Sequence, residues 1–150
     1  MSNPKEIINR KAKFEFEFLQ QYEAGIQLVG TEVKSLRLGN ANLRDAYCLF
    51  VNGELYLKNL HIGEYDHGNI YNHEPRRDRK LLLKKQELRK LHRRVTEKGL
   101  TIVPFKLFFS ERGLVKVGIA LAQGRRTYDK RQYIKEKDAK RELDRITKEH

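Results

Sequence analysis

Apolar and polar residues alternate near the start of the chain, where residues 14–18 read FEFEF. Successive side chains of a β-strand point to opposite faces, so this alternation predicts a half-buried strand. Residues 23–25 (EAG) predict a break, and residues 26–29 predict a returning strand. The first part of the chain is therefore expected to form two strands.

The clearest local pattern is Asn52-Gly53, which lies between two runs rich in β-branched and aromatic residues. Both central positions of a type I′ turn need positive φ, which Asn and Gly tolerate, so a tight hairpin is predicted. Residues 63–75 show no periodicity and predict a long loop. The predicted hairpin strands cover 46–51 and 54–57, and two later strands cover 100–109 and 114–121.

Residues 30–39 fit a short helix, with Thr31 as its N-cap and Gly39 just past its end. The apolar side chains of this helix would face inward, which would leave Glu32 and Lys34 accessible. From the pattern alone, Glu32 is best explained as an acid that complements the dipole of the first helical turn.

Residues 85–98 predict a longer helix that Gly99 closes at its C-terminal end. Lys85, Arg89 and Arg93 repeat every four residues and would form a cationic row on one face. The core-facing stripe on another face consists of Leu88, Leu91 and Val95.

About six strands and two helices in hairpin-rich order favour a mainly β fold, and an OB-type antiparallel β-barrel is the closest common architecture. We assign residues 1–124 to this barrel and 125–150 to a basic C-terminal tail that is disordered or helical. The apolar residues of the tail form no continuous stripe. The tail is therefore predicted to be solvated and to become ordered on a polyanionic partner. The alternative is an exposed helix that touches the body through Leu143 and Ile146.

The net charge of +12 over 150 residues predicts a polyanionic partner, with nucleic acid first and an anionic membrane surface second. Residues 76–94 hold ten Lys or Arg and two acids, a net charge of +8, and the tail adds +4. No signal-like segment and no apolar run of about 18 residues occurs. A cytoplasmic protein without membrane contact is predicted.

Candidate catalytic chemistry is sparse. The five His residues are scattered, and the single Cys48 lies in an apolar run that predicts a small core residue. The sequence contains no nucleophile-elbow, P-loop or dinucleotide motif. We therefore predict a protein that is not an enzyme and has no metal or other cofactor. The cationic helix, by contrast, favours RNA or DNA contact over an ordinary solvated face.

Six short blocks, in their order along the chain, resemble the SmpB family of SsrA-binding proteins. The blocks cover nearly the whole chain, and together they are highly specific. They are residues 9–12 (NRKA), 23–25 (EAG), 30–37 (GTEVKSLR), 79–83 (RKLLL), 99–104 (GLTIVP) and 128–131 (YDKR). The chain departs from the common family pattern at Lys84, at Phe14 and Phe16, and at Arg125-Arg126.

The resemblance implies an OB-type barrel that binds the tRNA-like part of transfer-messenger RNA (tmRNA) and acts with elongation factor Tu on stalled bacterial ribosomes. The tail would enter the empty mRNA channel near the decoding centre, and a monomer is expected. The resemblance and the basic patch together predict RNA contacts at Glu32, Lys34, Arg37, Arg79, Lys80, Leu83, Lys84, Lys85, Arg89 and Arg93. Ribosome contacts are predicted at Arg125, Arg126, Tyr128, Asp129, Lys130, Arg131, Ile134 and Lys135.

A general single-strand-binding protein of the OB type is the competing hypothesis. Such a protein binds bases on exposed aromatic side chains, and Tyr47, Tyr56 and Tyr65 are the candidates. An RNA-modifying enzyme would need a catalytic constellation that the sequence does not offer.

Overall fold

The computed structural model describes residues 6–66 and 72–149. Its strands are β1 (Ile7–Ile8), β2 (Phe16–Ile26), β3 (Ala41–Asn42), β4 (Tyr47–Val51), β5 (Glu54–Lys58), β6 (His61–Ile62), β7 (Arg79–Leu82), β8 (Thr101–Phe109) and β9 (Val115–Gly124). Its helices are α1 (Ala12–Glu15), α2 (Gly30–Arg37), α3 (Lys85–Lys98) and α4 (Thr127–Glu149). None of these helices is both long and apolar enough to span a membrane.

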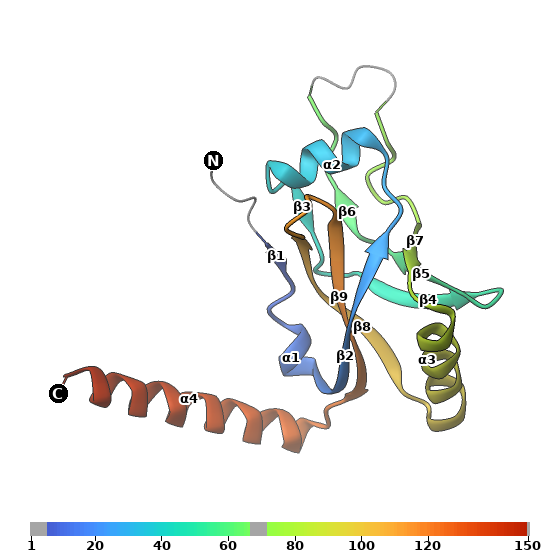
Figure 1. The fold of residues 1–150 in the computed structure, drawn as a ribbon. Coiled ribbons are helices and arrows are strands. Elements are labelled where there is room, and N and C mark those ends of the chain that lie inside the picture. The colour runs from blue at the N-terminus through green and yellow to red at the C-terminus, as the bar shows by residue number, and fades with distance from the viewer. Residues whose placement is uncertain (1–5, 67–71, 150) are drawn as a thin grey trace.

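Seven strands form one antiparallel sheet in the order β1-β8-β9-β2-β7-β5-β4, and β3 pairs separately with β6 (Figure 1). The mainly β, antiparallel prediction is confirmed. The sheet curls so that β4 packs against β8, but no backbone pairing joins these two strands in the described ranges. The fold is therefore a curled open sheet, and the predicted barrel is not closed.

The predicted hairpin is confirmed in β4 and β5, which are joined by Asn52 at φ 53° and Gly53 at φ 78°. The late strands β8 and β9 also lie where the pattern placed them, and their turn covers residues 110–114. Cys48 on β4 is half-buried against the core, and burial raises the pKa of its thiol. It is the small core residue that the sequence predicted.

The predicted break at residues 23–25 is wrong, because β2 runs without interruption to Ile26. Gly25 lies where β2 passes from pairing with β9 to pairing with β7, opposite Lys116 and Leu82. A Cβ atom at Gly25 would lie 3.3 Å from Cβ of Leu82. A glycine at this position therefore allows two strands to approach closely and does not form a turn. Phe14 also departs from the prediction, since it lies in α1 and not in a strand.

The hydrophobic core lies inside the curled sheet, and α3 contributes one fully buried residue to it. Leu91 is fully buried there, and Leu88 and Val95 pack beside it, as the helical spacing predicted. Gly99 ends α3 in the left-handed conformation. The other fully buried apolar side chains include Leu55, Leu57, Leu60, Ile62, Val117, Ile119 and Leu121.

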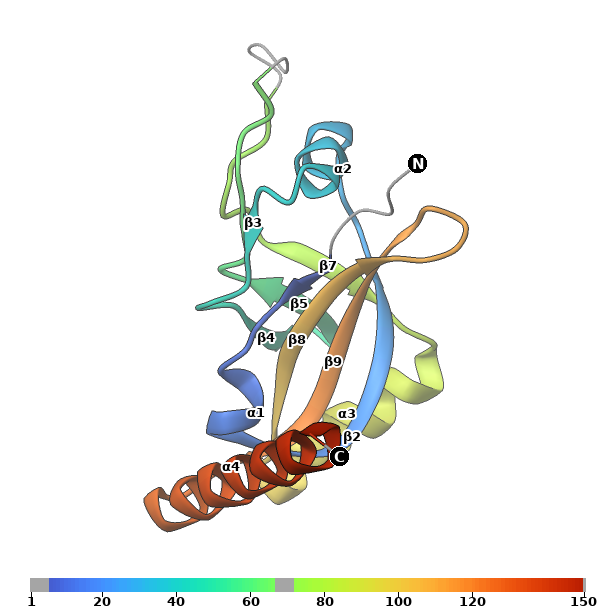
Figure 2. The ribbon, with the colours of Figure 1, turned by 90° about the vertical axis from the view of Figure 1, so that its left-hand side faces the viewer.

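Helix α4 leaves the end of β9 and extends away from the sheet past α1 (Figures 1 and 2). The other helices stay close to the sheet, with α2 near one end of it and α3 near the other (Figure 1). The cationic helix and the C-terminal helix are therefore separate features of the surface.

Candidate nucleic-acid interface

Glu32, in the first turn of α2, is completely buried (0% exposed). Its Oε1 accepts hydrogen bonds from the backbone N–H of Val29 (2.9 Å) and from Nη2 of Arg77 (2.6 Å). Its Oε2 is paired with Nε of Arg79. The expectation that Glu32 is accessible is wrong, because Arg77 just before β7 and Arg79 at the start of β7 bring two guanidinium groups onto the carboxylate.

Arg79 joins three segments that are distant in the sequence. It is fully buried, and besides Glu32 its guanidinium donates to the carbonyl oxygens of Leu60 (2.7 Å) and Pro75 (3.1 Å). These bonds tie α2 to the residue before β6 and to the segment before β7. Neither Glu32 nor Arg79 is exposed, whereas the predicted direct RNA contact needs an accessible side chain.

Burial by itself raises the pKa of Glu32. Hydrogen bonds from Arg77, from the Val29 N–H and from Arg79, together with the charge of Arg79, outweigh burial and bring the pKa of Glu32 below its ordinary value. Burial lowers the pKa of Arg79, but a guanidinium starts so high that it stays protonated at neutral pH. At neutral pH this is therefore an ion pair.

The lowered pKa of Glu32 predicts a loss of stability in acid. Its contribution to the free energy of unfolding is fully present above the unfolded-state pKa of about 4.3 and is lost as pH falls through the folded-state pKa. In urea titrations, the difference in stability between wild type and Glu32→Ala should shrink as pH is lowered below about 4.3. A difference that stays constant down to acid pH would contradict this assignment.

Thr31 is not the N-cap of α2, because that position belongs to Val29. The Thr31 hydroxyl instead lies 2.8 Å from Nδ1 of His73, and Nε2 of His73 lies 2.8 Å from the carbonyl oxygen of Ile62. Both ring nitrogens of His73 therefore have a hydrogen-bond partner. Nothing in the sequence indicates this contact, since 42 residues separate the two side chains.

The exposed end of α2 carries two cations. The Nζ atom of Lys34 lies 5.4 Å from the ring centroid of Tyr65, and the Arg37 guanidinium lies 5.4 Å from that of Phe109. Both side chains are exposed, as their predicted role in RNA contact requires.

The remaining predicted residues of β7 and its C-terminal end differ in exposure. Lys80 faces outward and pairs with Glu54 on β5 (3.3 Å), whereas Leu83 is half-buried against the core. Lys84, directly before α3, is exposed. Only part of the RKLLL block is therefore available to a ligand.

The α3 cationic row (Lys85, Arg89 and Arg93) is exposed, as predicted. Within the described residues, none of the three forms a salt bridge with an acid. A shallow hollow of about 330 Å³ lies beside it, lined by Arg89, His92, Arg93, Thr96 and Glu97. A row of unpaired cations on a rigid helix suits the regularly spaced phosphates of a nucleic acid.

The start of α4 is held against α1. The Arg125 backbone N–H donates to Glu15 O (2.9 Å), and its Nε donates to Lys13 O (3.1 Å). The Arg125 guanidinium also lies 4.6 Å from the ring centroid of Tyr133, and Nζ of Lys130 lies 5.7 Å from that of Phe14.

Beyond these contacts α4 is largely exposed. Arg126, Arg131, Ile134 and Lys135 are exposed, and Leu143 is 64% exposed. The side chains of Tyr128, Asp129 and Ile146 lie outside the described part of the chain. Lys130 in the first turn of α4 and Arg125 just before it thus contact α1. The alternative contact through Leu143 and Ile146 stays a prediction.

The proposed stacking residues do not gather on one surface. Tyr47 is 49% exposed, and Tyr56 lies on the same outward face of the β4–β5 hairpin, opposite Leu49. Tyr65, however, lies beside Lys34 of α2.

Comparison with known proteins decides the family. A family profile described as SmpB protein matches residues 6–149. The chain belongs to the SmpB family. This is not a family of enzymes, which confirms that prediction from the sequence.

Three relatives and one solved chain illustrate the similarity. An SsrA-binding protein of Christiangramia forsetii is 53% identical over 100% of this chain and 96% of its own length. SsrA-binding proteins of Phocaeicola vulgatus (97% of each chain) and Desulforamulus reducens (94% of this chain, 88% of the relative) are each 55% identical. A chain of the solved structure described as "tmRNA-SmpB: a journey to the center of the bacterial ribosome" is 48% identical, with TM-score 0.67, over 86% of this chain and 94% of that one.

In this SmpB family member, blocks that are distant in the sequence meet in space. The GTEVKSLR block forms α2 and the RKLLL block forms β7 and its end, and the Glu32–Arg79 pair joins them. The YDKR block opens α4, where Lys130 approaches Phe14 of α1. The blocks therefore include buried joints of the fold as well as surface residues.

Proposed function

We propose that this protein binds tmRNA and acts with it on bacterial ribosomes in trans-translation, the rescue of ribosomes stalled without a stop codon. The observation that carries the proposal is the α3 cationic row, which is exposed and without acidic partners in the described structure. Relatives that are more than half identical along nearly the full chain are SsrA-binding proteins, and the similar solved chain comes from a tmRNA–SmpB study of the ribosome.

The RNA-binding surface in this proposal combines the α3 cationic row with Lys84 and with Lys34 and Arg37 on α2. These side chains are exposed, and they lie on rigid helices or directly beside one. The buried Glu32–Arg79 pair holds α2 against the segment that leads through β7 to α3. RNA binding thus depends on surface cations, whose relative placement depends on a buried ion pair.

The C-terminal helix has a separate role in the proposal. The tail from Arg125 onward carries a net charge of +4, and its helix projects from the body. Such a helix fits a channel lined by ribosomal RNA, so we place it in the empty mRNA channel near the decoding centre. The protein then acts as a monomer in the cytoplasm, together with elongation factor Tu and the charged tmRNA.

The salt dependence of RNA binding tests the α3 cationic row. Changing Arg89 and Arg93 together to Ala should lower the slope of log K against log salt by about one for each phosphate that the protein no longer neutralises. Filter binding or fluorescence anisotropy with the tRNA-like part of tmRNA measures this slope. Arg112→Ala, which removes an exposed cation from the β8–β9 turn, is the matched control and should leave the slope unchanged. Equal slopes for all three proteins would exclude α3 from the interface.

A further inference from the structure

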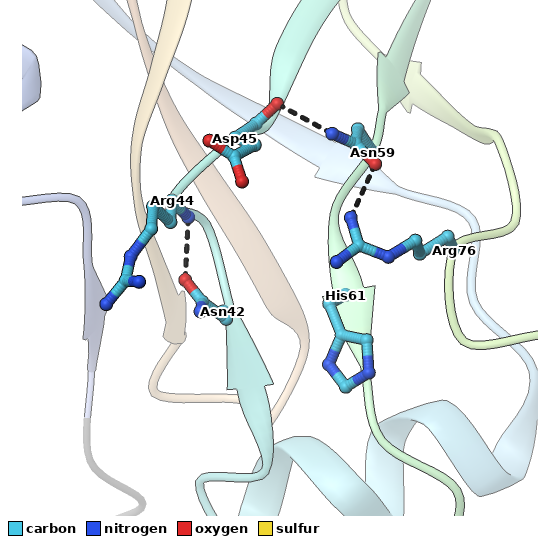
Figure 3. A pocket seen from close by; sticks show the side chains of 6 residues that line it. All are labelled: Asn42, Arg44, Asp45, Asn59, His61 and Arg76. Carbon is cyan, nitrogen blue, oxygen red and sulfur yellow. Dashed lines mark hydrogen bonds between the residues drawn. The ribbon is translucent and has the colours of Figure 1, made fainter.

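A polar hollow of about 230 Å³ lies beside the small β3–β6 sheet, apart from the residues that carry the proposed function (Figure 3). Its walls come from three places in the sequence: the segment between β3 and β4, the segment from β5 into β6, and the chain before β7. The lining residues are Asn42, Arg44, Asp45, Asn59, His61 and Arg76.

Asn59 organises this hollow through both ends of its amide. Its Nδ2 donates to the backbone oxygen of Asp45 (3.1 Å), and its Oδ1 accepts from Nη1 of Arg76 (2.6 Å). Its backbone has a φ of 60°, a conformation that glycine adopts more easily. Asn supplies two side-chain hydrogen bonds that glycine could not supply, and these fix the Arg76 guanidinium before any ligand arrives.

The hollow offers both hydrogen-bond donors and a hydrogen-bond acceptor. In Figure 3 the side chain of Arg76 reaches toward the space between β3 and β6 and the Asp45 carboxylate lies above that space, whereas the Arg44 side chain extends away from it. Within the described residues, the Asp45 carboxylate has neither an ion pair nor a hydrogen bond. A simple anion would be attracted by the Arg76 guanidinium but repelled by this carboxylate. The arrangement therefore suits a ligand with an anionic part and a separate hydrogen-bond donor.

We propose that the hollow binds one unpaired nucleotide of an RNA, with its phosphate on Arg76 and the amino group of its base on Asp45. Cytosine, adenine and guanine carry such an amino group, whereas uracil does not. The hollow of about 230 Å³ is lined by polar and charged side chains, which suit polar groups such as a base edge and a phosphate. This inference rests on the proposed function only in taking the nucleotide from a bound RNA.

Titration of the isotope-labelled full-length protein with single nucleotides tests the site directly. In proton–nitrogen NMR spectra, the side-chain amide signals of Asn59 and Asn42 should shift with GMP or CMP at several-fold lower concentration than with UMP. Asp45→Asn should remove this preference, because a neutral amide replaces the charged acceptor. Inorganic phosphate that matches GMP and CMP in its effect would reduce the hollow to an anion site and overturn the proposal, as would an absence of shifts with every nucleotide.

Asn59→Gly tests the hollow separately, because it removes the two side-chain hydrogen bonds of Asn59 and leaves the other proposed RNA contacts in place. Glycine accepts the local φ, so the variant should unfold at a temperature close to that of wild type, which thermal melting followed by circular dichroism checks. Its affinity for tmRNA should fall about tenfold, and the salt slope should fall by at most about one, for the single phosphate on Arg76. Wild-type affinity in this variant would overturn the inference and leave the proposed function intact. Failure of the wild-type protein to bind tmRNA would overturn the proposed function. The nucleotide titration would still show whether the hollow binds a nucleotide.

Discussion

Changing Glu32 to Ala is expected to lower the free energy of unfolding by about 3–5 kcal/mol at neutral pH, which is a large part of the stability of a small domain. The carboxylate is fully buried and is the acceptor for Arg77, Arg79 and the Val29 N–H. Its removal leaves the buried Arg79 guanidinium without a counter-charge. Urea denaturation followed by circular dichroism measures the change.

A surface ion pair provides the matched control. Glu54 pairs with Lys80 at 3.3 Å, but the side chain of Glu54 is 45% exposed. Glu54→Ala should therefore cost less than about 1 kcal/mol. Similar decreases in stability in the two variants would contradict the view that α2 and β7 are held together mainly by a buried ion pair. Glu32→Ala protein that still folds should also bind tmRNA more weakly, because the cations of α2 and α3 are no longer held in one arrangement.

Elements whose signals lie within a few neighbouring residues are the ones that the sequence predicted well. Asn52-Gly53 needs no distant partner to form its turn, and the spacing of Leu88, Leu91 and Val95 defines the buried side of α3 by helical geometry alone. The exposure of the α3 cationic row follows from the same spacing, because a residue opposite the buried stripe must face solvent. That part of the candidate interface was therefore predictable.

Features that depend on distant partners were not predictable in the same way. Gly25 resembles a break, yet it lies within β2, where Leu82 of another strand approaches closely. Glu32 has the local pattern of an exposed acid in a first helical turn, yet its partners lie 45 and 47 residues further along the chain. A sequence read by local periodicity cannot distinguish a carboxylate that faces water from one that faces two arginines.

Removal of residues 127–150 is expected to abolish tagging of stalled ribosomes, while the affinity for tmRNA stays close to that of the full-length protein. The cut spares the hydrogen bonds of Arg125 to Glu15 and Lys13, so the end of β9 stays attached to α1. Binding to tmRNA and tagging on a message without a stop codon are the two measurements. Loss of both activities would show that the division between residues 1–124 and the tail is wrong.

A proline in the tail separates the effect of the helix from the effect of its charge. Ala139 is exposed in the middle of α4, and Ala139→Pro keeps every charge but should destabilise the helix there by about 3 kcal/mol. Ala139→Ser preserves the helix and is the control. If tagging requires a continuous helix in the mRNA channel, Ala139→Pro should lose tagging and retain tmRNA binding, whereas Ala139→Ser keeps both. Normal tagging by Ala139→Pro would mean that the tail acts through its positive charge in any conformation, and that the long helix α4 is not itself required in the ribosome.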